Sequence, residues 1–233
     1  QMAKPPQPWE FRSKPAWQRL IIMLGGIIVN VLLAWLIYSA LLFVNGDEYI
    51  PLDKIENGIY ADASGEKLGL KTGDKIISVD GKNIKKFRKA YIDLLLGDEA
   101  VVNRNGKEIT IQLTDEGKKA VLESKGKRFL ELRQEAIIGH VRADYSAQFA
   151  DLQVEDKVIS INNSPIIFWD EFTSIIRASK NKTLHLNVER QGSIIPIVLK
   201  VPDSAIVGVS LSTKALQKLI VKDEYSVMEA IPA

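Results

Sequence analysis

The sequence predicts one membrane-spanning helix followed by two copies of a small α+β module. Three observations lead to this fold class: an uncharged apolar run near the N-terminus, an internal repeat in the rest of the chain, and a shared order of strand, turn, helix and hairpin in each copy. The chain has 233 residues, with 31 Lys and Arg against 29 Asp and Glu, and a net charge of +2. A charge this close to zero gives no reason to expect a nucleic acid as the partner.

The apolar run comprises residues 20–44 and contains no charged side chain. A helix of this length, rising about 1.5 Å per residue, is long enough to cross a hydrocarbon core of about 30 Å. A buried helix of a soluble protein would show a polar face, and a cleavable signal peptide would have a shorter apolar stretch. Basic residues precede the run, and Asp47 and Glu48 follow it. The positive-inside rule therefore predicts that residues 1–19 are a membrane-surface segment in the cytoplasm and that the rest lies outside.

The remaining sequence contains a repeat. Residues 70–84 resemble residues 152–166, and the pair Asp74-Lys75 recurs as Asp156-Lys157, 82 positions later. Such self-similarity is typical of two copies of one structural unit. We therefore expect a first domain at 50–125 and a second at 126–212.

Both copies have the same predicted order of elements. An alternating strand is followed by a turn that suits positive φ, Asp80-Gly81 in one copy and Asn162-Asn163 in the other. An amphipathic helix and a hairpin come next, and a segment rich in Lys and Glu, 114–133, is expected to be a solvated linker or a short helix between the copies. The predicted elements are strands at 75–79 and 157–161, helices at 86–95 and 169–179, and hairpins pairing 100–104 with 109–113 and 184–188 with 195–201.

The motif G-L-x-x-G-D-x-I-x-x-V-D-G spans residues 69–81. With the order of elements around it, this motif resembles PDZ domains of the circularly permuted bacterial type. The second copy departs from the motif, because Asp151, Glu155 and Asn163 replace its three glycines, so its turns are expected to differ in detail.

The two ends of the chain carry a narrower resemblance. Residues 11–19, followed by Gly25-Gly26 and Asn30, resemble the approach to the second transmembrane helix in the regulator-of-sigma-E protease branch of the site-2 protease family. Residues 225–233 resemble that family's approach to the next membrane helix, so 213–233 are expected to lead back to the membrane.

This family comprises zinc enzymes that cut a substrate helix inside the bilayer. The resemblance implies a zinc cofactor in the full-length enzyme, a place in the bacterial inner membrane and PDZ modules in the periplasm. The implied partners are the membrane, the remaining transmembrane helices of the protease, and transmembrane substrate proteins such as anti-sigma factors.

The chain itself lacks the residues of a zinc protease site. It has no cysteine, only His140 and His185, and no H-E-x-x-H. We therefore expect no catalytic or metal-binding residue here, and we expect a non-catalytic fragment of the enzyme. The resemblance implies a regulatory role, in which the PDZ pair admits substrates by size and binds substrate C-termini.

A PDZ groove lies between one sheet edge and one helix, and an extended peptide adds to that edge as a strand. In the second copy we expect the edge strand at 137–141, facing the helix that contains Phe172. Apolar residues on such a helix are often plain core, and His140 could equally be an ordinary surface residue. The predicted peptide-binding residues are Gly58, Ile59, Ala61, Phe87 and Tyr91 in the first copy, and Ile138, Gly139, His140, Val141, Phe172, Ile175 and Ile176 in the second.

Two other classes of protein are alternatives to the protease fragment. A serine protease with PDZ modules would need a Ser/His/Asp domain, and the sequence has no G-x-S-x-G. A non-catalytic, membrane-anchored PDZ adaptor fits the same residues as the protease fragment. The flanking gene sequence separates these two. An upstream H-E-x-x-H helix would indicate the protease, whereas a stop codon after Ala233 together with a start codon near Met2 would indicate the adaptor.

Overall fold

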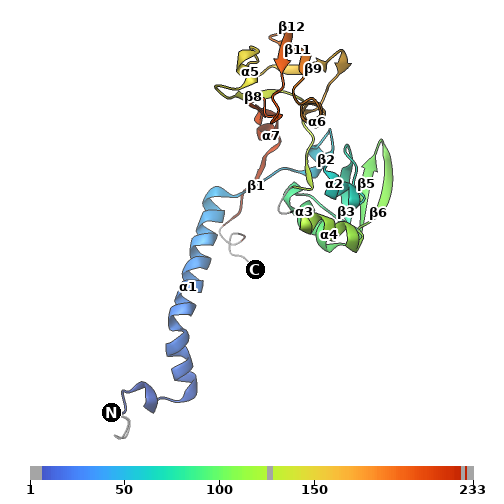
Figure 1. Cartoon of the computed structure of the whole chain (residues 1–233). Coiled ribbons are helices and arrows are strands. Elements are labelled where there is room, and N and C mark those ends of the chain that lie inside the picture. The colour runs from blue at the N-terminus through green and yellow to red at the C-terminus, as the bar shows by residue number, and fades with distance from the viewer. Residues whose placement is uncertain (1–6, 125–127, 227–228, 230–233) are drawn as a thin grey trace. The chain divides into compact units, whose positions relative to one another are not determined.

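The computed structural model describes residues 7–124, 128–226 and 229 (Figure 1). The chain divides into two compact units, Gln1–Glu48 with Lys222–Ala233, and Tyr49–Val221. The predicted cytoplasmic segment therefore lies partly outside the described residues, as does most of the predicted return to the membrane at 225–233.

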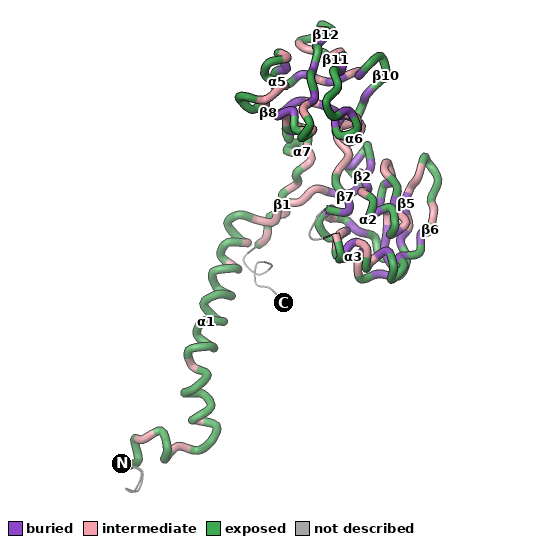
Figure 2. The backbone as a smooth tube through the Cα atoms, viewed as in Figure 1, coloured by how far each residue is buried: buried purple, intermediate pink, exposed green. Residues whose placement is uncertain are grey.

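The first unit is dominated by one long helix, α1 (Ala16–Asn45). The helix begins directly after Pro15, whose fixed φ suits a helix start, and ends at Gly46, which has a φ of 66°. No residue of α1 is buried, as Figure 2 shows along its whole length. By length and composition α1 can cross a membrane, and it contains the whole of the predicted span 20–44.

Short elements flank this helix. A 3-10 helix, η1 (Phe11–Ser13), precedes α1, and the strand β1 (Asp47–Tyr49) follows it. β1 pairs with the last strand described, β14 (Val221–Asp223), in a two-stranded sheet. The connections into and out of the unit Tyr49–Val221 therefore run side by side.

The unit Tyr49–Val221 contains two hydrophobic cores. One is built from buried side chains between residues 52 and 130, and the other from buried side chains between residues 136 and 207. We call residues 50–132 the first module and residues 134–212 the second module, and Arg133 joins them.

The first module consists of a four-stranded antiparallel sheet, a two-stranded sheet and short helices. The order of the larger sheet is β4-β3-β5-β6, and the smaller sheet pairs β2 with β7. The elements are η2 (Leu52–Lys54), β2 (Ile59–Ala61), α2 (Ala63–Lys67), β3 (Lys75–Val79), β4 (Lys82–Asn83), α3 (Phe87–Leu96), β5 (Glu99–Arg104), β6 (Lys107–Gln112), α4 (Asp115–Glu123) and β7 (Leu130–Leu132).

The second module has the same arrangement, as the internal repeat predicts. Its larger sheet has the order β10-β9-β11-β12, and its smaller sheet pairs β8 with β13. The elements are β8 (Ile138–Val141), α5 (Ser146–Phe149), β9 (Lys157–Ile161), β10 (Ser164–Pro165), α6 (Trp169–Ala178), β11 (Thr183–Arg190), β12 (Ser193–Lys200) and β13 (Val209–Leu211). The helix α7 (Lys214–Leu219) follows the module.

The segment expected to be a linker is instead part of the first module. The Thr114 hydroxyl accepts a hydrogen bond from the Gly117 N–H and starts α4, and Val121 is buried. Further on, Leu130 is fully buried and begins β7. The first core thus extends past residue 125, because Val121, Phe129 and Leu130 are buried although charged neighbours such as Lys119 and Glu123 are exposed.

The turns of the second module keep the backbone conformation of the first, although the sequence suggested differences. Gly69, Gly73 and Gly81 have φ values of 99°, 95° and 70°. Their counterparts Asp151, Glu155 and Asn163 have φ values of 60°, 71° and 66°. Asn and Asp adopt this left-handed region more readily than other side chains do, whereas a glutamate there is strained. The fold therefore imposes the same turns on a less suitable sequence.

Candidate functional site

Each module has one buried ion pair that holds the strands around the candidate groove. In the first module, both carboxylate oxygens of the fully buried Asp74 accept hydrogen bonds from Arg104, each at 2.7 Å. The Asp74 carboxylate also accepts from the Lys71 N–H at 2.8 Å, and the Asp74 carbonyl accepts from the N–H of Ile59, the first residue of β2. The hydrogen bonds from Arg104 to Asp74 raise the pKa of the guanidinium.

The second module repeats this ion pair. The buried Asp156 accepts from Arg190 at 2.7 and 2.8 Å and from the Gln153 N–H at 2.8 Å. Its carbonyl accepts from the Ile138 N–H at the start of β8. The sequence repeat contained both aspartates of the two pairs, but their contacts with the arginines were not predicted.

A cavity of about 220 Å³ lies between α6 and the chain that leads into β13. Phe172 and Ile176, both buried, belong to its helical wall. β13 pairs with β8 on one side, and β8 is the only strand that pairs with it among the described residues. The cavity is lined by Trp169, Phe172, Thr173, Ile176 and Arg177 of α6 and by Ala205, Ile206, Val207, Gly208 and Val209.

The structure brings together only part of the residue set predicted for the second copy. Phe172 and Ile176 line the cavity, whereas Ile175 packs against the hydrophobic core. The four predicted residues of β8 do not line the cavity, because β13 rather than β8 borders it. The stretch 205–209, which lies after the last hairpin, was missed. Its apolar residues Ile206 and Val207 were the available signal.

In the first module, the corresponding space between α3 and β7 is occupied by aromatic side chains. The Tyr91 hydroxyl donates a hydrogen bond to the Leu130 carbonyl on β7. Its ring packs edge-on against Phe87 and Phe129, with centroids 5.7 and 5.3 Å apart. Burial raises the pKa of Tyr91 to about 12. The predicted residues Phe87 and Tyr91 thus lie together.

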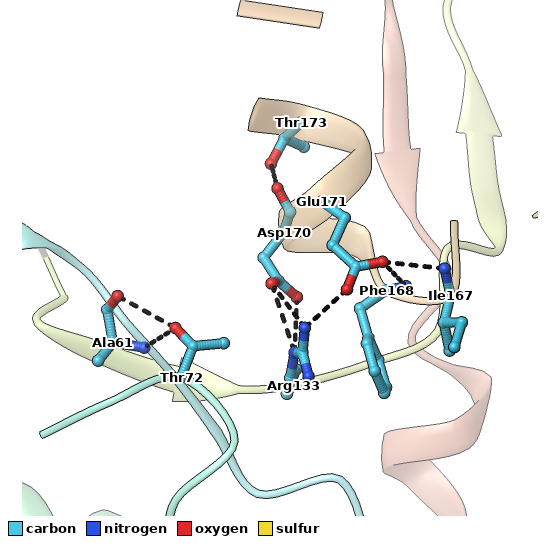
Figure 3. A network of polar contacts seen from close by, with 8 residues as sticks. All are labelled: Ala61, Thr72, Arg133, Ile167, Phe168, Asp170, Glu171 and Thr173. Carbon is cyan, nitrogen blue, oxygen red and sulfur yellow. Dashed lines mark hydrogen bonds and ion pairs between the residues drawn. The ribbon is translucent and has the colours of Figure 1, made fainter. Parts of the chain in front are cut away.

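The other residues predicted for the first copy lie further from this space. Gly58 precedes β2, and Ile59 and Ala61 belong to that strand, which pairs with β7. Figure 3 shows the Ala61 N–H donating to the Thr72 hydroxyl at 3.2 Å. As in the second module, the strand that was predicted to border the groove is paired with a strand from later in the chain.

The two modules differ at two matching positions. Thr173 lies 82 positions after Tyr91 and takes its place on the helix. Gly208 corresponds to Phe129, because the Gly208 carbonyl accepts from the Arg142 N–H just after β8, as the Phe129 carbonyl accepts from Asp62 just after β2. Smaller residues at both positions are consistent with the cavity in the second module.

Arg133 connects the first module to α6 (Figure 3). Its backbone N–H donates to the Gly58 carbonyl at 3.1 Å. Its guanidinium donates to Asp170 at 3.2 Å and to Glu171 at 2.8 Å, and it lies 3.7 Å from the centre of the Phe168 ring. A second Glu171 oxygen accepts from the Phe168 N–H at 3.1 Å and caps α6. One arginine therefore fixes the start of the helix that borders the cavity.

Among the described residues, no group of three or more His, Cys, Asp or Glu side chains could hold a metal ion. His140 and His185 are exposed and belong to different sheets. These residues do not fit a zinc site, and no catalytic step is derived from them.

The fold thus defines a class of protein, in which one helix able to cross a membrane is followed by a β-rich region built from two similar modules. The sequence matches the model of Peptidase family M50 over residues 1–230, and the chain belongs to that family.

Several curated relatives are similar to this chain. The regulator of sigma-E protease of Escherichia coli (strain K12) is 24% identical over 94% of this chain and 51% of the relative. A putative zinc metalloprotease of Fusobacterium nucleatum is 34% identical over 48% of this chain and 35% of the relative. Another, of Neisseria meningitidis serogroup A, is 24% identical over 86% of this chain and 48% of the relative. The chain spans about half the length, or less, of these relatives. Family membership and α1 together support a membrane location.

Proposed function

We propose that this chain is the regulatory, non-catalytic part of an intramembrane zinc protease. In this proposal α1 is the second transmembrane helix, and the two modules are PDZ-like domains of the circularly permuted type in the periplasm. The family match and the relatives' names support the protease assignment. Zinc and the groups that bind it would belong to other parts of the full-length enzyme.

The modules would control access to the protease by excluding substrates with bulky extracytoplasmic domains. One observation carries this part of the proposal: β1 starts two residues after α1 ends and pairs with β14. Both modules are therefore inserted between two paired strands, the first of which directly follows a helix able to cross a membrane. An insertion tied at both ends in this way is suited to act as a barrier.

Replacing residues 50–220 of the full-length enzyme by a short Gly/Ser linker tests the barrier. This change keeps β1 and β14, and we expect the enzyme to cut intact substrate that the unaltered enzyme leaves uncut. The measurement is the appearance of cleaved substrate in membranes, with substrate lacking its extracytoplasmic domain as the control for retained activity. Cleavage of the control substrate together with continued rejection of the intact substrate would refute the gating role.

The second module would also hold the C-terminus of a substrate peptide. An extended peptide would add to the side of β13 that faces α6, with its last side chain against Phe172 and Ile176. The backbone N–H groups of Val207 and Gly208 would receive the terminal carboxylate, because those of Ala205 and Ile206 donate to Pro202 and Ser204. The first module would not bind in this way, because Tyr91 and Phe129 occupy the matching space.

A further inference from the structure

We call the cavity between α6 and residues 205–209 the peptide cavity. A larger cavity, of about 710 Å³, adjoins it within the unit Tyr49–Val221. Trp169, Thr173 and Arg177 line both cavities, so the two meet along one face of α6. The walls of the larger cavity also include residues of α3 and β7 from the first module.

Positive charge predominates in this larger cavity. Its lining contains four arginines but only two carboxylates, Glu131 and Asp170. Arg133 is engaged by Asp170 and by Glu171. The described residues provide no ion pair for the other three arginines, which are exposed: Arg88, Arg128 and Arg177.

Two of these arginines, Arg128 and Arg177, lie close enough to tyrosines that line the cavity to act on them electrostatically. Burial raises the pKa of Tyr60, and the positive charge of Arg177 opposes this rise. The charge of Arg128 likewise opposes the burial that raises the pKa of Tyr91. Both tyrosines line the cavity, so Arg128 and Arg177 act on the same space from different modules.

The direction of β13 determines which part of a bound peptide would reach this space. Val209, at the start of β13, lines the peptide cavity, whereas Leu211, at its end, lines the arginine-rich cavity. A bound peptide would have its carboxylate at Val207 and Gly208 and would extend along β13. The residues that precede its C-terminus would therefore lie progressively closer to Leu211. At about 3.4 Å per residue, the residues some three to six positions before the C-terminus would enter the arginine-rich cavity.

We propose that the arginine-rich cavity selects peptides with acidic residues about three to six positions before their C-terminus. This inference rests on the proposed peptide-binding role of the second module, and it adds a charge requirement to it. The unpaired guanidinium groups of Arg88, Arg128 and Arg177 would bind these carboxylates, since charge complementarity favours an acidic partner.

Two labelled ten-residue peptides test this selection. Both end in valine with a free carboxylate, and positions three to six before the C-terminus are Glu in one and Gln in the other. Binding to the full chain in neutral detergent micelles is measured by fluorescence anisotropy. We expect the Glu peptide to bind about tenfold more tightly at low salt, and the advantage to shrink at high salt, because several partly exposed ion pairs each contribute little and are screened.

Matched variants locate the effect. Arg88→Gln/Arg128→Gln should remove most of the preference for Glu by weakening the binding of the Glu peptide far more than that of the Gln peptide. Arg142→Gln, an exposed arginine beyond β8, is the control and should retain the preference.

Each outcome decides between the two proposals. Equal affinity for the Glu and Gln peptides would overturn the charge selection and leave the peptide-binding role intact. Failure of both peptides to bind would overturn the peptide-binding role, and the charge selection with it. An equal loss of preference in Arg142→Gln would show a general charge effect and would also overturn the selection.

Discussion

Asp156→Asn is expected to lower the free energy of unfolding of the second module by about 3–5 kcal/mol, the usual cost of removing one partner of a buried ion pair. Asp156 is fully buried, and both its oxygens are bound by Arg190. An asparagine would place a donor against the guanidinium and remove its buried counter-charge, leaving only the exposed Asp151. The measurement is hydrogen exchange of the full chain in detergent. Amides of β9 and β11 should exchange at least about a hundredfold faster, while those of β3 and β5 keep their rates.

The same arginine provides a matched control. Asp151 also pairs with Arg190, at 3.2 Å, but its side chain is 76% exposed. Asp151→Asn, the same chemical change, should therefore cost less than about 1 kcal/mol. Equal effects of the two variants would contradict the view that the buried pair, rather than the charge of Arg190 alone, stabilises this module.

Arg133→Ala is expected to destabilise the start of α6 by about 2–3 kcal/mol. The change leaves Asp170 and Glu171 without their shared cation, and Asp170 is only 12% exposed. Contact with the Phe168 ring is lost as well. We expect faster hydrogen exchange at the first amides of α6, together with a lower midpoint of thermal unfolding.

Arg133→Lys distinguishes charge from geometry. Lysine keeps the charge but cannot bind both carboxylates with a planar fork or stack on Phe168 in the same way. It should recover only part of the lost stability. Full recovery by lysine would show that a single positive charge is sufficient, and unchanged exchange in Arg133→Ala would show that the network does not hold α6 in place.

Local sequence patterns predicted most of the longer secondary-structure elements. The strands at 75–79 and 157–161 have the predicted bounds, since alternation between two faces fixes a strand and its ends. Asp80-Gly81 and Asn162-Asn163 form turns with positive φ at both residues, as predicted. The predicted span lies within α1 because an uncharged run of this length strongly favours a helix.

Contacts between distant segments could not be predicted in the same way. β7 and β13 are three residues long, too short to show a periodic pattern, and they join their sheets only through partners some 70 positions earlier in the chain. For this reason β2 and β8 were predicted to lie next to the helix of each module, whereas β7 and β13 occupy that position. Arg104 and Arg190 each pair with a buried aspartate, and this pairing depends on the folded sheet.

The peptide-binding role of the predicted residues remains a prediction. Among those expected in the second module, Phe172 and Ile176 are the ones that line the cavity. Their apolar spacing on an amphipathic helix would be the same if they served only the core. The second module has a cavity beside its helix, whereas aromatic side chains occupy the matching space in the first module. This difference depends on Thr173 and Gly208, which replace Tyr91 and Phe129, and the match of Gly208 with Phe129 is evident only in the folded structure.

The central claim is that α1 crosses the membrane and places both modules on its outer side. Because the chain has no cysteine, single cysteines at exposed positions report location directly. The variants are Gln7→Cys before α1, Lys107→Cys in the first module and Lys180→Cys in the second. Intact spheroplasts are treated with a membrane-impermeant maleimide. The account predicts labelling at 107 and 180, and labelling at 7 only after the membrane is opened. Protection of 107 and 180, or labelling of all three before the membrane is opened, would contradict it.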